Sequence, residues 1–381
     1  MEQVKLIITG DLYPTGNCGQ FLIQGEEKMV FNDILPEFDA ADYIVSNLET
    51  PLTDINSPID KDGANLKASP ATLKGLKNAG IKAFNLSNNH IMDQGRAGIQ
   101  STLQALDDFG IASFGAGTNL NAAKEPLTFE IKGIKVGILG FAEHEFSIAS
   151  ENQSGAAPLM IPDNIRSIQT VKSKVDHLII LYHGGKEHYP YPTPNQQNIS
   201  RFFIEQGADA VIAQHSHIAG AYEEYHGKLI LYGQGNFLFE KQARNYETWM
   251  EGLLVKFAIS KETMEYKFIP VKQSDSFIGV KKMDDKESVE LLSRIKNYAD
   301  KVISPSFVAQ EWAKLCEKER LLYQSRLAGH NKYFRFLNRK IGFASWFYPK
   351  WKKNMIRNVI ECETHREGLE MLWKIDDAKN Q

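Results

Sequence analysis

The sequence predicts an α/β fold in which strands alternate with helices around a largely parallel sheet. Short apolar runs recur along the first two thirds of the chain, and each is followed by a polar or glycine-containing cluster. Helical patterns lie between several of these runs. Ligands bind beyond the carboxyl ends of the strands in such sheets. We therefore expect the polar clusters to form one site.

The first expected strand is the run from Val4 to Thr9, close to the N-terminus. Six further strands are expected in segments that share an apolar run with a polar end. In chain order these are DYIVSNLETPL, IKAFNLSNNHIMDQG, IKVGILGFAEHEFS, HLIILYHGGKEHY, DAVIAQHSH and KLILYGQGNFLF. Short runs of this kind, bounded by turn residues, are typical of buried strands.

The expected helices have recognisable starts and stops. In SPATLKGLKNAG, Ser69 is a suitable N-cap, Pro70 fits the first helical position and Gly80 ends the pattern. The patterns RAGIQSTLQALDDFG and PNQQNISRFFIEQG end at Gly110 and Gly207 in the same way. Helices between strands imply βαβ units and parallel pairing.

Beyond the last strands the pattern is helical alone, so we expect two domains, 1–275 and 276–381. The second contains NKYFRFLNRKIGFASWFYPKWKKNMIRNVI, residues 331–360, with eight Lys or Arg, eight aromatic residues and no Asp or Glu. One interpretation is peripheral contact with an anionic surface such as the inner membrane face. The other is an amphipathic element that packs its aromatic side chains on the main domain.

Composition excludes several classes of protein. The 381 residues are 43% hydrophobic and 24% charged, with a net charge of -3, which does not favour nucleic-acid binding. The three cysteines form no CxxC pair, which argues against a thiolate zinc site and for a reducing compartment. The N-terminus has no basic, then apolar, leader pattern, so we expect a cytoplasmic protein.

The segment QHSH places His215 and His217 two residues apart at the end of an apolar run. If the strand continued through them, both imidazoles would point to the same face. Buried imidazoles that converge call for a metal or a carboxylate partner. The alternative is a pair of solvated loop histidines, and the motif alone does not decide between them.

The side chains that follow the strands mix carboxylate, amide and imidazole groups, namely Asp11, Glu49, Asn89, His183, His215 and His217. Oxygen and nitrogen donors suit Mn, Fe or Zn, as well as Co or Ni. A carboxylate such as Glu49 or Asp11 can bridge two ions, and paired ions suit phosphoryl chemistry. His90 would protonate the leaving oxygen, and Asp93 would orient His90. Taken singly, Asp11 could close a turn and NNH could cap a helix.

Six segments together resemble the CapA-type capsule synthesis proteins of the PGA_cap family, relatives of calcineurin-like metallophosphoesterases. They are GDLYPTG, SNLETPLT, LSNNHIMDQG, YHGGKEHY, AQHSHI and GKLILYGQGNFLF, over roughly residues 5–240. The resemblance implies a four-layer αββα sandwich with one or two divalent transition metal ions at the strand ends. It also implies a role in making or attaching a capsule or exopolymer.

The resemblance implies that the six donors named above are the metal ligands and that His90 is their catalytic neighbour. It implies that Glu187, His188 and Asn236 line the site. Asn47 and Lys67 are further substrate-binding candidates, although Lys67 also fits a solvated loop lysine. His144 and Glu145 follow a strand and are second-line candidates, whereas His177 and His226 are expected to be structural.

The sequence departs from the metallophosphoesterase pattern at three points. Tyr13 stands where the first motif has His, Asn47-Leu48-Glu49 replaces Gly-Asp, and Asn88-Asn89-His90-Ile91 replaces Gly-Asn-His-Asp/Glu. The first departure weakens one of two metal positions. We expect a metal-dependent enzyme that catalyses phosphoester hydrolysis or phosphoryl transfer on a phosphorylated or acidic glycan or polymer. The alternatives are a poly-γ-glutamate assembly protein and a non-enzymatic polymer-binding scaffold.

Overall fold

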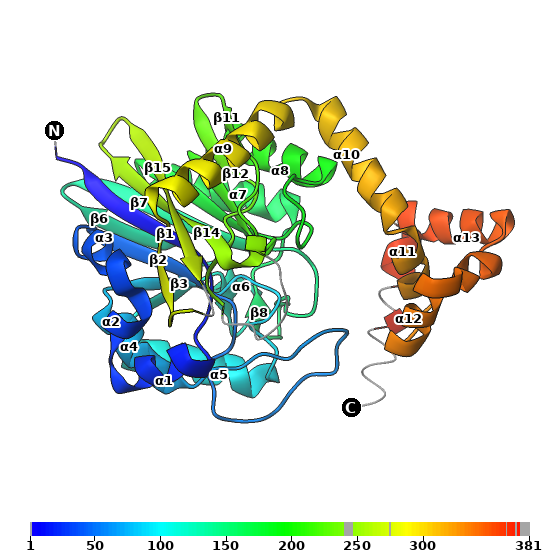
Figure 1. Cartoon of the computed structure of the whole chain (residues 1–381), viewed down its shortest axis with the longest axis horizontal. Helices are drawn as coiled ribbons and strands as arrows, with labels where there is room; N and C mark the ends of the chain where they lie inside the picture. The colour runs from blue at the N-terminus through cyan, green and yellow to red at the C-terminus, as the bar shows by residue number, and fades with distance from the viewer. Residues whose placement is uncertain (1, 240–246, 274–275, 363, 370–371, 374–381) are drawn as a thin grey trace. The chain divides into compact units, whose positions relative to one another are not determined.

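Two mixed β-sheets form the centre of the first part of the chain (Figure 1). The computed structural model describes residues 2–239, 247–273, 276–362, 364–369 and 372–373. The larger sheet has the order β16 (Val280–Lys282), β15 (Met264–Gln273), β14 (Glu251–Ile259), β1 (Val4–Tyr13), β2 (Tyr43–Leu48), β3 (Ala83–Asn85) and β4 (Ala112–Phe114), with β13 (Asn236–Phe239) also beside β1. The second has the order β11 (Tyr222–Tyr225), β12 (Lys228–Leu231), β10 (Ala210–Gln214), β9 (His177–His183), β7 (Ile134–Ala142) and β6 (Leu127–Ile131). A short pair joins β5 (Ala116–Gly117) to β8 (Gly155–Ala156).

Each sheet has a parallel centre and antiparallel edges. In the larger sheet β1, β2, β3, β4 and β13 pair in parallel, whereas β14, β15 and β16 pair antiparallel. In the second sheet β7, β9, β10 and β12 are parallel, and β6 and β11 are antiparallel. The parallel strands are covered on both faces, so β9 is buried at every residue. The expected parallel arrangement is therefore confirmed for the central strands.

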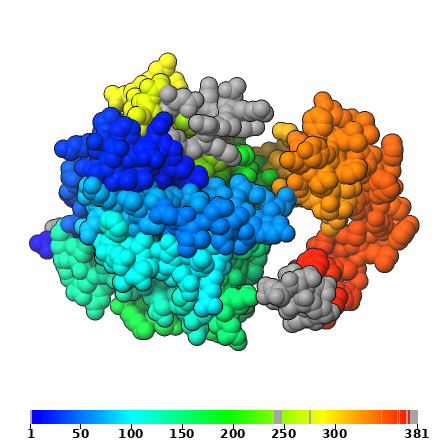
Figure 2. Space-filling model, turned by 90° about the horizontal axis from the view of Figure 1, so that it is seen from below, coloured from blue at the N-terminus to red at the C-terminus, as the bar shows by residue number. Residues whose placement is uncertain are grey.

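Three hydrophobic clusters show that these elements stack as four layers. Leu6 and Ile8 of β1 pack between the sheets, while Ile7 packs on the outer side of the larger sheet. The helices on that side are α1 (Gly16–Gln24), α2 (Glu27–Phe31), α3 (Leu35–Asp39), α4 (Leu73–Asn78) and α5 (Gly95–Asp108). Figure 2 shows the blue and light-blue surface that the early part of the chain gives to this side. On the outer side of the second sheet lie α7 (Ile161–Lys172) and α8 (Pro194–Glu205), with the short α6 (Leu120–Ala123) nearby. The predicted αββα fold class is confirmed.

The predicted cap residues and glycines begin and end the helices in the structure. The Ser69 side chain accepts a hydrogen bond from the backbone N–H of Ala71 and starts a 3₁₀ turn, Pro70–Thr72, that leads into α4. The Thr193 side chain caps α8, and Pro194 takes its first position. Gly80 and Gly207 have φ angles of 89° and 118°, which only glycine adopts readily, so both helices stop there.

The C-terminal part of the chain is helical, as expected. It consists of α9 (Asp285–Val302), α10 (Pro305–Lys318), α11 (Arg320–Leu327), α12 (Lys332–Ile341), a 3₁₀ segment (Phe343–Phe347) and α13 (Lys350–Glu361). The chain divides into compact units at Met1–Val308 and Ala309–Gln381. The division lies within α10, so α9 belongs to the first unit, where Leu291 and Ile295 join the core between the sheets. None of the described helices has the length and apolar character needed to cross a membrane.

Candidate metal centre

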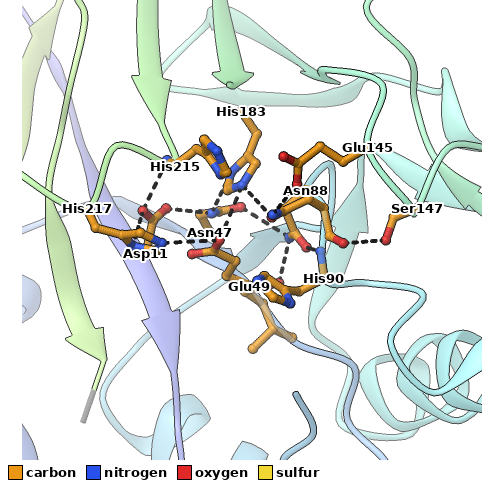
Figure 3. A network of polar contacts seen from close by, with 12 residues as sticks. Asp11, Asn47, Glu49, Asn88, His90, Glu145, Ser147, His183, His215 and His217 are labelled. Carbon is orange, nitrogen blue, oxygen red and sulfur yellow. Dashed lines mark hydrogen bonds and ion pairs between the residues drawn. The ribbon is translucent and has the colours of Figure 1, made fainter. Parts of the chain in front are cut away.

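The polar side chains expected at the strand ends converge at the carboxyl edge of the two sheets (Figure 3). From the larger sheet come Asp11 near the end of β1 and Glu49 directly after β2. From the second sheet come His183, the last residue of β9, and the two histidines that follow β10. The turn after β3 adds Asn89. The sequence places these residues far apart, and the parallel topology brings them together.

The end of β1 is shaped so that Asp11 faces the site. The strand continues past the expected end at Thr9, but its pairing with β2 and β13 shifts register around Asp11. Gly10 permits this, because a Cβ atom there would lie 2.0 Å from the carbonyl oxygen of Gly235. The backbone segment before β13 can therefore pass directly beside β1.

Two groups of ligand atoms lie at metal-binding distances and share one carboxylate. Glu49, His183 and His215 form one group, and Asp11, Glu49 and His217 form the other, with the ligand atoms of each group within 4.8 Å of one another. Glu49 Oε1 lies 3.3 Å from His183 Nε2 and 3.9 Å from His217 Nε2. A shared carboxylate between two donor groups is the arrangement that bridges a pair of cations.

The unmet hydrogen-bonding capacity of these groups provides a test of whether a metal fits. Glu49 is fully buried, yet both of its carboxylate oxygens have no hydrogen-bond partner among the described residues. The same is true of His215 Nδ1. Buried polar atoms are otherwise almost always paired, and a buried carboxylate needs a compensating charge. The residues present therefore fit a divalent cation.

Burial also governs the proton affinity of the two carboxylates. Burial, reinforced by the negative charges of Asp11 and Glu187, raises the pKa of Glu49 well above its ordinary value of 4.5. Burial raises the pKa of Asp11 from 3.8 to about 6, against hydrogen bonds from Asn47 and the backbone of His215 that lower it. Burial therefore disfavours the ionised form of both groups, and a nearby positive charge would stabilise that form.

The buried imidazoles have the opposite tendency. Burial, followed by the neighbouring His215 and His217, holds the pKa of His183 well below 6.5. Burial and His215 likewise lower the pKa of His217. Both rings are therefore neutral near pH 7, which is the form that binds metal ions.

A second layer of amide side chains orients the ligands. Asn47 donates from Nδ2 to Asp11 Oδ1 at 2.7 Å and is itself fully buried, so it lies behind the ligands and not at an open substrate surface. Asn236 Oδ1 lies 2.9 Å from His217 Nδ1, which leaves Nε2 of that ring turned toward the site. Asn89 places Oδ1 at 3.0 Å from His183 Nε2 and donates from Nδ2 to Glu145. Glu145, a second-line candidate, is thus part of this layer.

His90 and Asp93 form a pair at the rim of the cluster. His90 Nδ1 lies 2.6 Å from Asp93 Oδ2, and the His90 side chain is 15% exposed whereas Asp93 is buried. Lys61 completes this group, because its ammonium contacts Asp93 and lies 3.3 Å from His90 Nδ1, with only 1% of its side chain exposed. Lys61 lies in a loop without a periodic pattern, so the sequence does not identify it as a candidate site residue. The structure therefore joins Lys61, His90 and Asp93 in one group of three side chains.

The remaining candidates lie farther from the ligands. The ammonium of Lys67 contacts the carbonyl oxygens of Asp54 and Ile55 within its own loop, at 3.4 and 3.3 Å. Glu187 and His188 are exposed. The His188 ring lies 6.5 Å from that of His217 and 5.5 Å from that of Trp249, so His188 adjoins the site.

The reason given for the convergence of His215 and His217 was wrong. Strand β10 ends at Gln214, so the two histidines lie in a loop, where the alternation of a strand does not apply. They have φ angles of 88° and 57°, and this left-handed backbone turns both rings inward. They are 6% and 4% exposed, which excludes the solvated alternative. His177, by contrast, is structural as expected, with Nε2 2.8 Å from the carbonyl oxygen of Ser260.

Comparison with known proteins gives one family and several relatives. The family described as "Bacterial capsule synthesis protein PGA_cap" matches residues 5–241. "Capsule biosynthesis protein CapA" of Bacillus anthracis is 27% identical over 250 residues, which cover 63% of this chain and 61% of that protein. "PGA biosynthesis protein CapA" of Bacillus subtilis is 27% identical over 282 residues, covering 72% and 73%. A crystal structure of a novel phosphatase from Mycoplasma pneumoniae is similar with a TM-score of 0.45 and 15% identity, covering 72% of this chain and 96% of that chain.

Proposed function

The chain belongs to the PGA_cap family of bacterial capsule synthesis proteins. We propose that it is a metal-dependent enzyme that hydrolyses phosphoesters or transfers phosphoryl groups during capsule or exopolymer synthesis. The observation that carries this proposal is Glu49, a fully buried carboxylate without hydrogen-bond partners among the described residues, shared by two groups of ligands. A site that only stabilised the fold would pair such a carboxylate with a donor. The substrate class that fits is a phosphorylated or acidic glycan or polymer.

Each of the two proposed ions would take ligands from both sheets. Asp11 and His217 would hold one ion, His183 and His215 another, with Glu49 between them and Asn89 Oδ1 beside His183. Bound Mn, Fe or Zn ions would supply the positive charge that stabilises a phosphoryl group during its transfer. The amide layer supports this by fixing the ligand orientations before any ion arrives.

His90 is suited to proton transfer at the leaving oxygen. Its Nδ1 faces Asp93 at 2.6 Å, so Nε2 is the nitrogen that can face a substrate. It is also the partly exposed member of a cluster whose ligands are buried, which places it on the side that a substrate can reach. Lys61 and Asp93 hold the ring in this orientation, as a general acid requires.

A second candidate function is assembly of poly-γ-glutamate without phosphoester chemistry. It is favoured by the name of the Bacillus subtilis relative, a PGA biosynthesis protein, and by Tyr13 in place of a first-motif histidine. In this case the metal cluster would organise an acidic polymer and would not hydrolyse a phosphoester.

Metal content and phosphatase activity of the same preparations test these functions. We would compare wild type, the double variant His215→Ala/His217→Ala and the control His226→Ala, a change at an exposed histidine outside the cluster. The proposal expects near-stoichiometric Mn, Fe or Zn in wild type and control but not in the double variant. It also expects metal-dependent release of phosphate from an aryl phosphate, stopped by chelation.

Two results would contradict the proposal in different ways. Metal binding without hydrolysis of mono- or diesters, together with action on poly-γ-glutamate, would favour the second candidate. No metal in wild type after incubation with each ion, with polymer binding unchanged in the double variant, would indicate a scaffold protein.

A further inference from the structure

Helix α12 is buried through one polar residue and exposes its apolar side chains. Of its residues only Asn338 is fully buried, and its side chain donates to Leu321 O and Ser325 Oγ at 2.9 Å and accepts from the backbone N–H of Ala344 at 2.7 Å. Its apolar side chains instead face outward, with Tyr333 at 72% and Phe336 at 61% exposure. Globular packing usually gives the reverse arrangement. The helix is thus held in its own unit by an asparagine, and its apolar side chains are largely exposed among the described residues.

Exposed apolar side chains also occur in the next two segments of the chain. We call this set the basic aromatic surface. Its exposed members are Tyr333, Phe334, Phe336, Leu337, Ile341, Trp346, Phe347, Trp351 and Met355. In α13, Trp351 and Met355 are four residues apart and therefore lie on one face of the helix. Exposed apolar groups in this number, on consecutive elements, are characteristic of an interaction surface.

The charge of this region is one-sided. Residues 331–360 hold eight of the 44 Lys and Arg residues of the chain and none of its 47 Asp and Glu residues. Within the described part of the chain no carboxylate pairs with Lys332, Lys340 or Lys353. The ammonium of Lys340 instead lies 5.8 Å from the ring centre of Phe336. The surface is therefore cationic in a protein whose net charge is -3.

From these observations we propose that the basic aromatic surface docks the protein on a membrane that contains anionic lipids. Aromatic side chains beside Lys and Arg suit the boundary between headgroups and acyl chains, where rings are buried and cations meet phosphate. A helix bound in this way lies in the plane of the interface. The rest of the chain carries the negative charge, so an anionic surface attracts this region and repels the remainder. The proposal does not depend on the metal centre.

Vesicle flotation of the full-length protein tests the proposal. The probes are phosphatidylcholine vesicles with 30% phosphatidylglycerol and vesicles of phosphatidylcholine alone, each at low and high salt. We expect binding to the anionic vesicles at low salt, and strong weakening at high salt or without the anionic lipid. Tryptophan fluorescence should shift to shorter wavelength on binding, because Trp346 and Trp351 leave water.

Two variants and a matched control separate charge from apolar contact. Lys340→Gln/Lys350→Gln/Lys353→Gln should weaken binding about fivefold for each lysine, roughly 100-fold together. Trp346→Ala/Trp351→Ala should abolish the fluorescence shift and weaken binding at both salt concentrations. The control Lys286→Gln/Lys296→Gln/Lys314→Gln removes three exposed lysines outside the region and should bind like wild type. Circular dichroism establishes that each variant is folded.

The proposal fails if wild type binds neither vesicle, if it binds both equally, or if the lysine variant binds like its control. Salt-sensitive binding to soluble poly-glutamate without binding to vesicles would assign the surface to a polyanion and overturn the lipid proposal. Because His215→Ala/His217→Ala should bind vesicles normally, failure here is distinguishable from failure of the metal-dependent activity.

Discussion

Replacement of Glu49 by Gln should stabilise the protein when metal is removed by a chelator, although it removes a central ligand. The wild-type carboxylate is fully buried, has no hydrogen-bond partner among the described residues and lies near other acidic groups. Gln has the same shape and the polarity of the protonated carboxyl group, but it cannot ionise. The variant therefore removes an electrostatic cost without opening a cavity.

The size of the effect has an upper bound. The rise in the pKa of Asp11 from 3.8 to about 6 corresponds to a cost of about 3 kcal/mol at pH 8, even though Asp11 accepts two hydrogen bonds. Glu49 accepts none, and burial raises its pKa well above its ordinary value, so it has a cost of the same sign. That cost cannot exceed about 5 kcal/mol at pH 8, because a carboxyl group with an ordinary pKa of 4.5 can take up a proton instead of ionising. We expect Glu49→Gln to raise the free energy of unfolding by up to about 5 kcal/mol at this pH.

The sign of the pH dependence follows from the direction of the pKa shift. A carboxyl group whose pKa is raised in the folded state costs nothing below the unfolded value of 4.5. The cost grows as the pH rises from 4.5 to the folded pKa and is constant above it. The difference between variant and wild type should therefore fall to about 1 kcal/mol or less at pH 5.

Urea unfolding in the presence of EDTA, followed by circular dichroism at pH 5 and pH 8, measures this difference. Glu151→Gln, a change at an exposed glutamate, is the matched control and should have little effect at either pH. With excess Mn the order should reverse, because only wild type keeps the shared ligand and gains stability from binding. A variant less stable than wild type at pH 8 in EDTA would refute the reasoning, since the carboxylate would then have a stabilising partner.

Two further predictions concern the backbone and the loop beside the site. Gly10→Ala should destabilise the fold by about 3 kcal/mol or more in urea unfolding, because the new Cβ would lie 2.0 Å from the oxygen of Gly235. The control Gly368→Ala, at an exposed helical position with nothing within 4 Å of the new Cβ, should be neutral or slightly stabilising. Lys61→Met should lower kcat on a phosphoester about tenfold or more, because it removes the ammonium that orients His90 and Asp93. Lys67→Met is the matched control and should have activity close to that of wild type. Equal loss in the two lysine variants would show that the Lys61 contact has no positioning role.

Local patterns in the sequence were sufficient to predict a largely parallel α/β sheet and to propose the ligands, whereas the four-layer arrangement was expected from the family resemblance. Apolar runs identified the parallel strands, and parallel strands end at one edge of the sheet. Asp11, Glu49 and His183 could be assigned to strand ends without any knowledge of tertiary contacts. The bounds were less accurate, since β1 continues to Tyr13 through a register shift that no periodicity reveals.

Long-range contacts account for what the sequence could not predict. Lys61 reaches Asp93 from a loop 32 residues earlier, and nothing in KDGAN distinguishes it from Lys67, which was chosen instead. Trp249 lies with its ring 4.4 Å from that of His217, but it comes from a short 3₁₀ turn, Glu247–Met250, far along the chain. Asn47 was expected to bind substrate, and its hydrogen bond to Asp11 is a contact that the sequence could not reveal. Contacts of this kind depend on which loops the fold places side by side.

Two kinds of energetic cost fall on the same few residues, and a bound cation would offset one of them. His215 and His217 adopt left-handed backbone conformations, which cost about 1–3 kcal/mol each for residues other than glycine. Glu49 adds the cost of a buried carboxylate without hydrogen-bond partners among the described residues. Solvent cannot hydrate these side chains, because the two histidines are 6% and 4% exposed and Glu49 is not exposed at all. Hydrogen bonds to Asp11 and His217 also limit relaxation of the ligands themselves. A cation that binds all of these groups would recover the electrostatic part of the cost in one step, so stability and metal affinity should change together in variants of this cluster.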